Sequence, residues 1–544
     1  ARLRFTSGAT RDLATPTIDH ASQAHQLAAL AWERFPEADE AIRRRVIHLL
    51  HAKKATTEDI SSVVKLEVTR ERPLHIRRWM DLLWLHLDSD QSELTRNDFE
   101  LRYAQLLSQL HIAPNTIRLS DVRELSVQAD NPIRRGLSAP FKPGHAIRSG
   151  GGTEVVNDAR RWARNFSQSH PVLAARLYRE IALADLRSGR NAEGMKASRN
   201  ALFLSRKGAE QPNDDETTEI EATIPLNPLR LTQPEIDAAT TYSAALVYAG
   251  RPKEAIDVCE TMSNRCQQMG RTRGEAAFRI NGAIAALQTG QRTRAIDEIA
   301  RAKGLQHTHG DNRVFGNLAV TAARLAVERA DLAASPLLLD EAITAAQGLG
   351  DSDLLGEAWS VALDKAALTG NVGEAKRALM AYGEDGVWSS HDHFPATLAR
   401  WQWTRGNLEK ALLATDEPRQ GFGGACVSAE RCRLLLLNGN IEACIAASKA
   451  LIRTSEIHGW SDLSKFADLV LGAALRVEDG AYQSLIATSR QSRWVHLYLG
   501  ALHLDAIRRR GRGENVMPQL RRLRSRASDL GHLMYEALAN PKGW

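Results

Sequence analysis

A short pattern of apolar and polar positions recurs along most of this chain. Each copy has an apolar helical stretch, a glycine, and five residues later a small or apolar residue that opens the next helix. The clear copies are LRSGRNAEG, VYAGRPKEA, LQTGQRTRA, LTGNVGEA, WTRGNLEKA and LLNGNIEAC, centred on Gly189, Gly250, Gly290, Gly370, Gly406 and Gly439. Two weaker copies centre on Gly480 and Gly511, and VERADLAAS replaces the glycine turn in a degenerate copy near Ala330.

The pattern has a physical reason. Glycine readily takes the left-handed conformation that ends a helix, and a small residue five positions on lets two helices approach closely. Repetition of this turn predicts stacked helical hairpins that resemble the TPR consensus, with the first helix of each hairpin lining a concave surface. We therefore expect an all-α fold, a TPR-like superhelix (α-solenoid) over residues 158–544.

Two segments interrupt the pattern. Residues 134–157 contain SAPFKPGHAIRSGGGTEVVN, whose two prolines and four glycines predict a linker. Residues 207–234 carry six acidic side chains and four prolines, which predicts an acidic insertion between neighbouring repeats.

The first 133 residues predict a smaller helical unit. Asp19 is a good helix cap, and apolar residues on one face predict a helix that runs to Phe35. Further helices are expected at about 40–53, 79–87 and 99–110.

Composition agrees with helices. The 544 residues are 43% hydrophobic but only 6% aromatic, and the apolar residues are mainly Ala and Leu. The formal net charge of +6 permits an acidic or nucleic-acid partner without requiring one.

An odd number of scattered cysteines indicates reduced thiols and a cytoplasmic protein; these are Cys259, Cys266, Cys426, Cys432 and Cys444. No membrane span or signal peptide is expected. The start at Ala1 suggests a piece of a longer gene product.

The opening of the chain resembles a segment of the MalT-like proteins, large ATP-binding regulators of the LuxR family. Phe5, Ser7 and Arg11 match the short strand and turn that close a winged-helix-like region after the ATPase of those proteins. A helix that begins near His20 or His25 follows, and then a second helix bears His48 and His51. The motif covers about the first 55 residues.

This resemblance implies the sensor region of a transcription regulator. A small-molecule inducer, with a sugar as one candidate, would bind the repeats and relieve autoinhibition of an ATPase that then multimerises. No GxxxxGK[ST] phosphate loop and no C-terminal helix-turn-helix is present, so ATP is implied only for an ATPase outside this region and no cofactor is expected here. The implied partners are the inducer, the regulator's own ATPase and DNA-binding domains, and further copies of the chain.

No catalytic motif stands out, so we expect a binding protein rather than an enzyme. Cys426 and Cys432 have no histidine at ligand spacing. The pairs at His307 and His309 and at His391 and His393 lack the third and fourth ligands that zinc needs, so no metal is expected.

Aromatic and planar polar side chains that could hold a sugar cluster in two loop-to-helix segments, and Trp359 occupies a comparable first-helix position in another repeat. The candidate ligand-binding residues are Asp311, Asn312, Arg313, Trp359, Trp388, His391, Asp392, Trp401 and Trp403. The alternative is structural, because tryptophan in a repeat helix usually packs on its neighbour and HGDN simply caps a helix.

Two further points stay open. The arginine-rich tail favours a solvated terminal helix, with a contact to nucleic acid or a neighbouring domain as the alternative; its arginines are Arg508, Arg509, Arg510, Arg512, Arg521, Arg522, Arg524 and Arg526. The second reading of the whole chain is an interaction scaffold that binds a partner protein or peptide in its concave groove.

Overall fold

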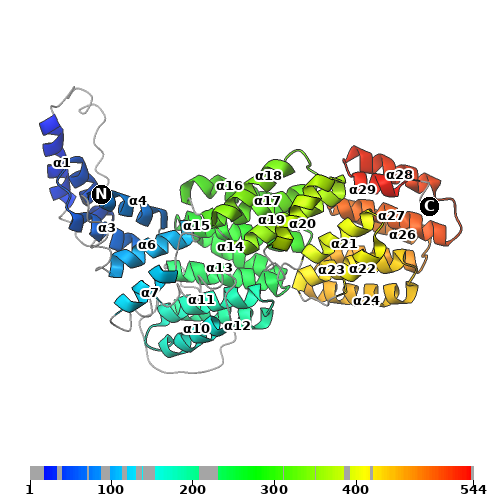
Figure 1. The fold of residues 1–544 in the computed structure, drawn as a ribbon, viewed down its shortest axis with the longest axis horizontal. Coiled ribbons are helices and arrows are strands. Elements are labelled where there is room, and N and C mark those ends of the chain that lie inside the picture. The colour runs from blue at the N-terminus through cyan, green and yellow to red at the C-terminus, as the bar shows by residue number, and fades with distance from the viewer. Residues whose placement is uncertain are drawn as a thin grey trace. The chain divides into compact units, whose positions relative to one another are not determined.

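The fold was analysed in a computed structural model, in which the described residues are 18–32, 39–69, 73–86, 99–112, 119–129, 138, 153–207, 231–309, 312–349, 351–384, 393–416 and 421–540. Over these residues the regular structure is helical, as expected for an all-α protein (Figure 1). The chain divides into two compact units, Ala1–Ser138 and Ala139–Trp544. No helix in the described part combines the length and the hydropathy of a membrane span.

The first unit consists of short amphipathic helices. Its helices are α1 (Ile18–Trp32), α2 (Asp39–His51), α3 (Thr57–Thr69), α4 (Pro73–His86), α6 (Phe99–Ile112) and α7 (Leu119–Gln128). The expected helices correspond to α1, α2, α4 and α6, whereas α3 and α7 were not predicted. The winged-helix-like segment around Phe5 lies outside the described residues.

Three of the histidines that carry the resemblance meet between α1 and α2. The Nδ1 atoms of His25 and His48 are 3.0 Å apart, and the ring of His25 stacks on His51 with centroids 4.9 Å apart. Burial, and then the charges of His25 and His51, lower the pKa of His48.

The second unit is an array of helical hairpins. Its helices are α10 (Thr153–Phe166), α11 (Pro171–Arg187), α12 (Asn191–Lys207), α13 (Gln233–Tyr248), α14 (Pro252–Gln268), α15 (Thr272–Gln288), α16 (Arg292–His309), α17 (Asn312–Glu328), α18 (Ser335–Leu349), α19 (Ser352–Thr369), α20 (Val372–Glu384), α21 (Phe394–Thr404), α22 (Leu408–Ala414), α23 (Gly421–Leu437), α24 (Ile441–His458), α25 (Ser461–Ala474), α26 (Asp479–Gln491), α27 (Val495–Gly511), α28 (Met517–Asp529) and α29 (Leu533–Leu538).

Odd-numbered helices from α11 to α27 are the first helices of the hairpins, and even-numbered helices from α12 to α28 are the second helices. Each first helix packs on its own second helix and also on the first helix of the next hairpin. Figure 1 shows these hairpins following one another from α11 to α28. This is the TPR-like arrangement that the repeated turn predicts.

The structure confirms the predicted left-handed conformation of the turn residues and the burial of the small residue that follows. All six glycines of the clear copies have positive φ, and Ala330 adopts the same conformation with φ +57° in the degenerate copy. Five residues beyond the turn the small side chain is buried, for example at Ala255, Ala295 and Ala375, each 0% exposed. The close approach of the two helices therefore depends on this small residue.

The two weak copies were placed wrongly. The left-handed residues are Arg476 and Gly513, not Gly480 and Gly511. Gly480 lies inside α26 and Gly511 is the last residue of α27, so neither has to leave helical geometry.

One of the two predicted interruptions overlaps a helix. Helix α10 begins at Thr153, inside the segment expected to be a linker, and the two units divide between Ser138 and Ala139. The acidic insertion falls between the end of α12 and the start of α13, and its residues 208–230 lie outside the described residues.

Turns that are distant in sequence meet within the second unit. The Nδ1 atom of His458 lies 2.8 Å from the carbonyl oxygen of Gly250, and the Ser461 hydroxyl donates to the carbonyl oxygen of Thr289 at 2.6 Å. Arg292 forms a buried ion pair with Asp462. We call these contacts between the turns after α13 and α15 and the α24–α25 turn the clasp.

Candidate binding surface

A cluster of arginines and carboxylates lies on three consecutive first helices. Asp237 of α13 accepts from Arg179 of α11 at 3.0 Å and from Arg273 of α15 at 2.9 Å. Arg179 also pairs with Glu180 at 3.1 Å, and Arg176 lies close enough to feel the charges of Arg179 and Asp237. We call these five residues the arginine cluster.

The arginine cluster contains three guanidinium groups and two carboxylates. Burial, together with the positive charge of Arg179, lowers the pKa of Arg176 to about 10, and Asp237 offsets this only in part. For Arg179 the effect of burial is outweighed by Asp237 and Glu180, so its pKa is raised. The side chains of Arg179 and Arg273 remain 18% and 27% exposed, so solvent reaches them.

A second chain of charges crosses the first helices further along the array. Arg400 of α21 pairs with Asp364 of α19 and with Glu430 of α23, the latter at 2.8 Å. Glu430 also pairs with Arg433, which is fully buried beneath the face of Trp403 at 4.4 Å from the ring centroid. Each of these buried ions needs an oppositely charged partner, because a buried ion without one would carry a large desolvation penalty.

Within this row of paired charges, the opposite charges of the neighbouring side chains favour the ionised forms of Glu430 and Arg400. Burial alone would raise the pKa of Glu430, but Arg433 and Arg400 outweigh it and hold the pKa well below its usual range. Burial alone would lower the pKa of Arg400, but Asp364 and Glu430 raise it. The carboxylate of Glu430 and the guanidinium group of Arg400 therefore stay ionised at physiological pH.

Three histidines beside these ions are neutral. Burial and then the charge of Arg400 lower the pKa of His496 well below its ordinary value. Burial and Arg433 lower the pKa of His503 to about 3, and burial and Arg400 lower that of His532 to about 4. They act at neutral pH as dipoles and ring surfaces, not as charges.

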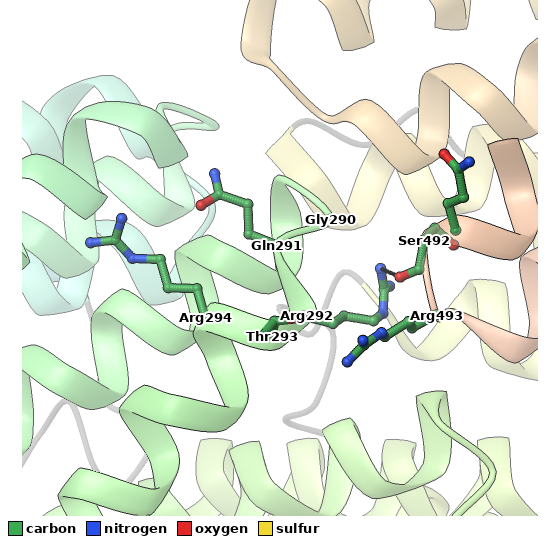
Figure 2. Close-up of a pocket in the computed structure, with 8 residues that line it drawn as sticks. Gly290, Gln291, Arg292, Thr293, Arg294, Ser492 and Arg493 are labelled. Carbon is green, nitrogen blue, oxygen red and sulfur yellow. Dashed lines mark hydrogen bonds between the residues drawn. The ribbon is translucent and has the colours of Figure 1, made fainter.

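A polar cavity of about 330 Å³ lies beside the clasp. It is formed by the turn between α15 and α16, the start of α16 and the turn after α26; its lining residues are Gly290, Gln291, Arg292, Thr293, Arg294, Gln491, Ser492 and Arg493. Figure 2 shows Arg292 extended from α16 toward Ser492, with the side chain of Arg493 beside it. The size is at the lower end of the range of small-ligand pockets.

Arg292 forms one wall of this cavity and belongs to the clasp. Its guanidinium group pairs with Asp462 and, at 2.8 Å, with Glu328, and lies 5.2 Å from the ring centroid of Trp494. Only 3% of its side chain is exposed. In contrast Arg493 is exposed, so it is the more accessible of the two cations.

The predicted ligand residues that the structure describes do not form one open site. Trp401 and Trp403 are each 6% exposed and lie in the hydrophobic core, while Trp359 packs against that core. Arg313 is paired with Asp351 at 3.6 Å, which places it at the junction of α17 and α19. The packing alternative describes the environment of the tryptophans, and ligand binding by these residues stays a prediction.

The remaining predicted ligand residues cannot be placed. Asp311, Trp388, His391 and Asp392 lie outside the described residues, as does the side chain of Asn312.

The arginine-rich tail divides into two parts. Arg508 is fully buried and pairs with Asp505 at 2.9 Å, and Arg509 is also largely buried against Asp479, so these two were wrongly expected to be solvated. In α28 the arginines are exposed around the buried Leu523, as the sequence predicts; they are Arg521, Arg522, Arg524 and Arg526.

Sequence reasoning missed the buried charges. Arg400, Glu430 and Arg433 lie in largely apolar helices, and Arg433 is followed directly by LLLL. A charged residue on the apolar face of a predicted helix indicates a buried partner elsewhere, and that signal was available.

Comparisons with known proteins add little to this picture. No protein-family model matches the sequence, and no curated protein matches it either. A solved Rap protein in complex with Competence and Sporulation Factor is 8% identical, with a TM-score of 0.46 over 66% of this chain and 95% of that chain. Aspartyl phosphate phosphatase F from Bacillus subtilis is 12% identical, with a TM-score of 0.39 over 66% of this chain and 91% of that chain.

These sequence identities and TM-scores are too low to assign a class of protein. The class is therefore defined by the chain's own helices and turns, which are those of an all-α, TPR-like helical-repeat protein. The resemblance to MalT-like regulators gains no support from either comparison and stays a prediction.

Proposed function

We propose that this chain is an interaction scaffold, without catalysis of its own, whose first-helix face binds an acidic segment of a partner protein. The observation that supports the proposal is the arginine cluster, in which guanidinium groups from α11 and α15 converge on α13 while remaining partly exposed. A carboxylate-bearing segment would complement these groups, because arginine pairs with carboxylates in a planar, two-pronged geometry.

Repeat architecture supports a protein partner. Stacked hairpins present an extended surface built from the same helix of each repeat, which suits an elongated segment better than a compact metabolite. Charge complementarity at such a surface mainly sets specificity and association rate, so binding would weaken in high salt.

Site-specific photocrosslinking tests the proposal. A photoreactive residue at Gln233, next to Asp237 on α13, is expected to capture one partner in low-salt extract, with the crosslink mapping to an acidic segment. The matched control places the same group at the exposed Lys303 of α16, a second helix. The synthetic acidic segment should then bind the purified chain, and the double variant Arg179→Gln/Arg273→Gln should bind at least about tenfold more weakly.

Arg294→Gln is the charge control for each of the two substitutions taken singly, since Arg294 pairs with Glu260 between second helices. Equal loss in Arg294→Gln and in the cluster variant would show only a general charge effect and would contradict the proposal. Capture at Lys303 but not at Gln233 would also contradict it.

A second candidate function is small-molecule sensing of the kind found in MalT-like regulators. The polar cavity beside the clasp favours it, because a ligand there would contact the turn after α15 and the turn after α26 at once. A screen of mono-, di- and oligosaccharides by thermal unfolding should give a shift that Arg493→Ala removes and Arg521→Ala retains. A screen without any shift would count against this candidate.

A further inference from the structure

The short C-terminal helix α29 lies on the first-helix side of the array. Its Tyr535 hydroxyl lies 3.0 Å from His496 Nδ1 on α27 and accepts from Arg433 Nη1 on α23 at 3.3 Å. Helix α29 also contacts α19, five hairpins earlier along the array. A segment that follows the last hairpin thus covers part of the first-helix face, at helices other than those that carry the arginine cluster.

Arg433, His496 and Gly500 form the site that receives Tyr535 of α29, and we call this site the seat. The side chain of Tyr535 is fully buried, and its hydroxyl lies 3.2 Å from the point where a Cβ on Gly500 would be. Any larger residue at position 500 would therefore displace the hydroxyl. The ring of His503 stacks on Trp403, and its centroid lies 6.4 Å from that of the Tyr535 ring, edge to face.

The fit of α29 is incomplete. His532, at the start of the helix, is fully buried, and neither of its ring nitrogens has a hydrogen-bond partner among the residues that the structure describes. A buried polar group left in this state opposes the docked conformation. Moreover, a helix of six residues has little stability of its own and depends on its contacts.

A short turn joins α28 to α29. Gly531, with φ +68°, separates the two helices, and Leu533 of α29 remains 53% exposed. The buried contacts of α29 come from a few side chains, chiefly His532, Met534 and Tyr535.

We propose that α29 is an internal, displaceable ligand: it occupies in cis a helix-binding seat formed by Arg433, His496 and Gly500, and so restricts access to the first-helix face. This inference rests on the proposed function for its biological meaning. The kind of partner that fits the seat is a short helix that presents a tyrosine hydroxyl to Arg433 and His496.

A peptide of residues 528–544 tests the seat in the full-length chain. Tyr535→Ala in the chain removes the anchoring hydrogen bonds of the resident helix, so the labelled wild-type peptide should bind this variant at least about tenfold more tightly than it binds the wild-type chain. Adding Gly500→Val should abolish this gain, because the valine side chain fills the place of the peptide's hydroxyl.

Peptide variants provide the matched controls. Tyr535→Phe in the peptide should weaken binding about fivefold to tenfold, whereas Ala537→Ser, at an exposed position, should have no effect. His532→Leu in the peptide should strengthen binding, because it removes the unpartnered imidazole. Equal peptide binding by the wild-type and Tyr535→Ala chains, or none by either, would overturn the inference.

If the Tyr535→Ala chain does not fold, amide hydrogen exchange in the wild-type chain tests the same inference. The amides of α29 should exchange at least about tenfold faster than those of α27, through local opening. Exchange of both helices at one common rate would overturn the inference. This outcome is independent of the photocrosslinking at Gln233, so failure of one proposal can be told from failure of the other.

Discussion

Ala330 occupies a turn position that glycine fills in the six clear copies of the repeat. Its φ of +57° places a Cβ atom in the left-handed region, where it crowds the backbone. We predict that Ala330→Gly raises the free energy of unfolding by about 0.5–1 kcal/mol, measured by urea denaturation.

The reverse change at Gly439 is the control. Its φ is +77°, and a Cβ built there would meet nothing within 4 Å, so the effect of Gly439→Ala is purely conformational. We expect a loss of about 1 kcal/mol. A stabilised Gly439→Ala, or a destabilised Ala330→Gly, would contradict this account of the turn.

At the scale of single residues the sequence was a partial guide. The turn glycines and Ala330 could be predicted, because their conformation follows from local chemistry. The environment of Trp403 could not, because its partners Arg433 and His503 come from helices far along the chain. A side chain's local sequence does not tell whether it faces solvent or a distant helix.

Among the elements, the spacing between turn and small residue controls helix approach. Ala295 is 0% exposed at the start of α16, where α16 packs on α15. We predict that Ala295→Leu lowers the free energy of unfolding by about 1–3 kcal/mol through overpacking, as measured by urea denaturation. Asp297→Leu on the exposed face of α16 should change it by no more than about 0.5 kcal/mol. Equal losses in both variants would point to helix propensity instead of packing.

The clasp joins elements that the hairpin stack alone would leave apart. Asp462 and Arg292 are 5% and 3% exposed, so removing the carboxylate leaves a buried cation whose acidic partner among the described residues is Glu328. We predict that Asp462→Ala lowers the free energy of unfolding by about 3 kcal/mol and speeds amide exchange in both α16 and α25.

Arg294→Gln is the surface control for the clasp, and about 0–1 kcal/mol is expected there. Faster exchange confined to α25 in Asp462→Ala would show that the clasp does not couple the two regions.

The turns of the clear copies were predicted well, whereas the turns of the two weak copies and the distant contacts were not. The turns of the clear copies follow from patterns within a few residues of each glycine. The clasp depends on superhelical geometry that accumulates over several repeats, which no local pattern encodes. Sequence alone therefore predicted the hairpins but not the clasp, the polar cavity beside it or the seat of α29.

For the whole molecule, the buried histidines predict a loss of stability in mild acid. In the unfolded chain an imidazole takes up a proton below pH about 6.5, whereas His503 and His532 in the folded chain resist protonation down to about pH 3 and 4. The unfolded state thus binds more protons between these limits, and stability falls as the pH falls through this window. Each histidine contributes about 1.4 kcal/mol per pH unit.

Urea denaturation at pH 7.5 and 5.5 and constant ionic strength measures this effect. His532→Leu should reduce the difference in unfolding free energy between the two pH values by one histidine's share. An unchanged free energy of unfolding at the two pH values would contradict the prediction.

Arrays of hairpin repeats commonly change length in evolution by duplication or deletion of a unit, since each unit contacts only its neighbours. The clasp removes that freedom here. His458 must reach Gly250 across 208 residues, and Ser461 must reach Thr289 across 172. Gain or loss of one hairpin between them would rotate the two ends out of register. The repeats enclosed by the clasp are therefore expected to be constant in number among relatives, and length variation should be confined to the segments outside it.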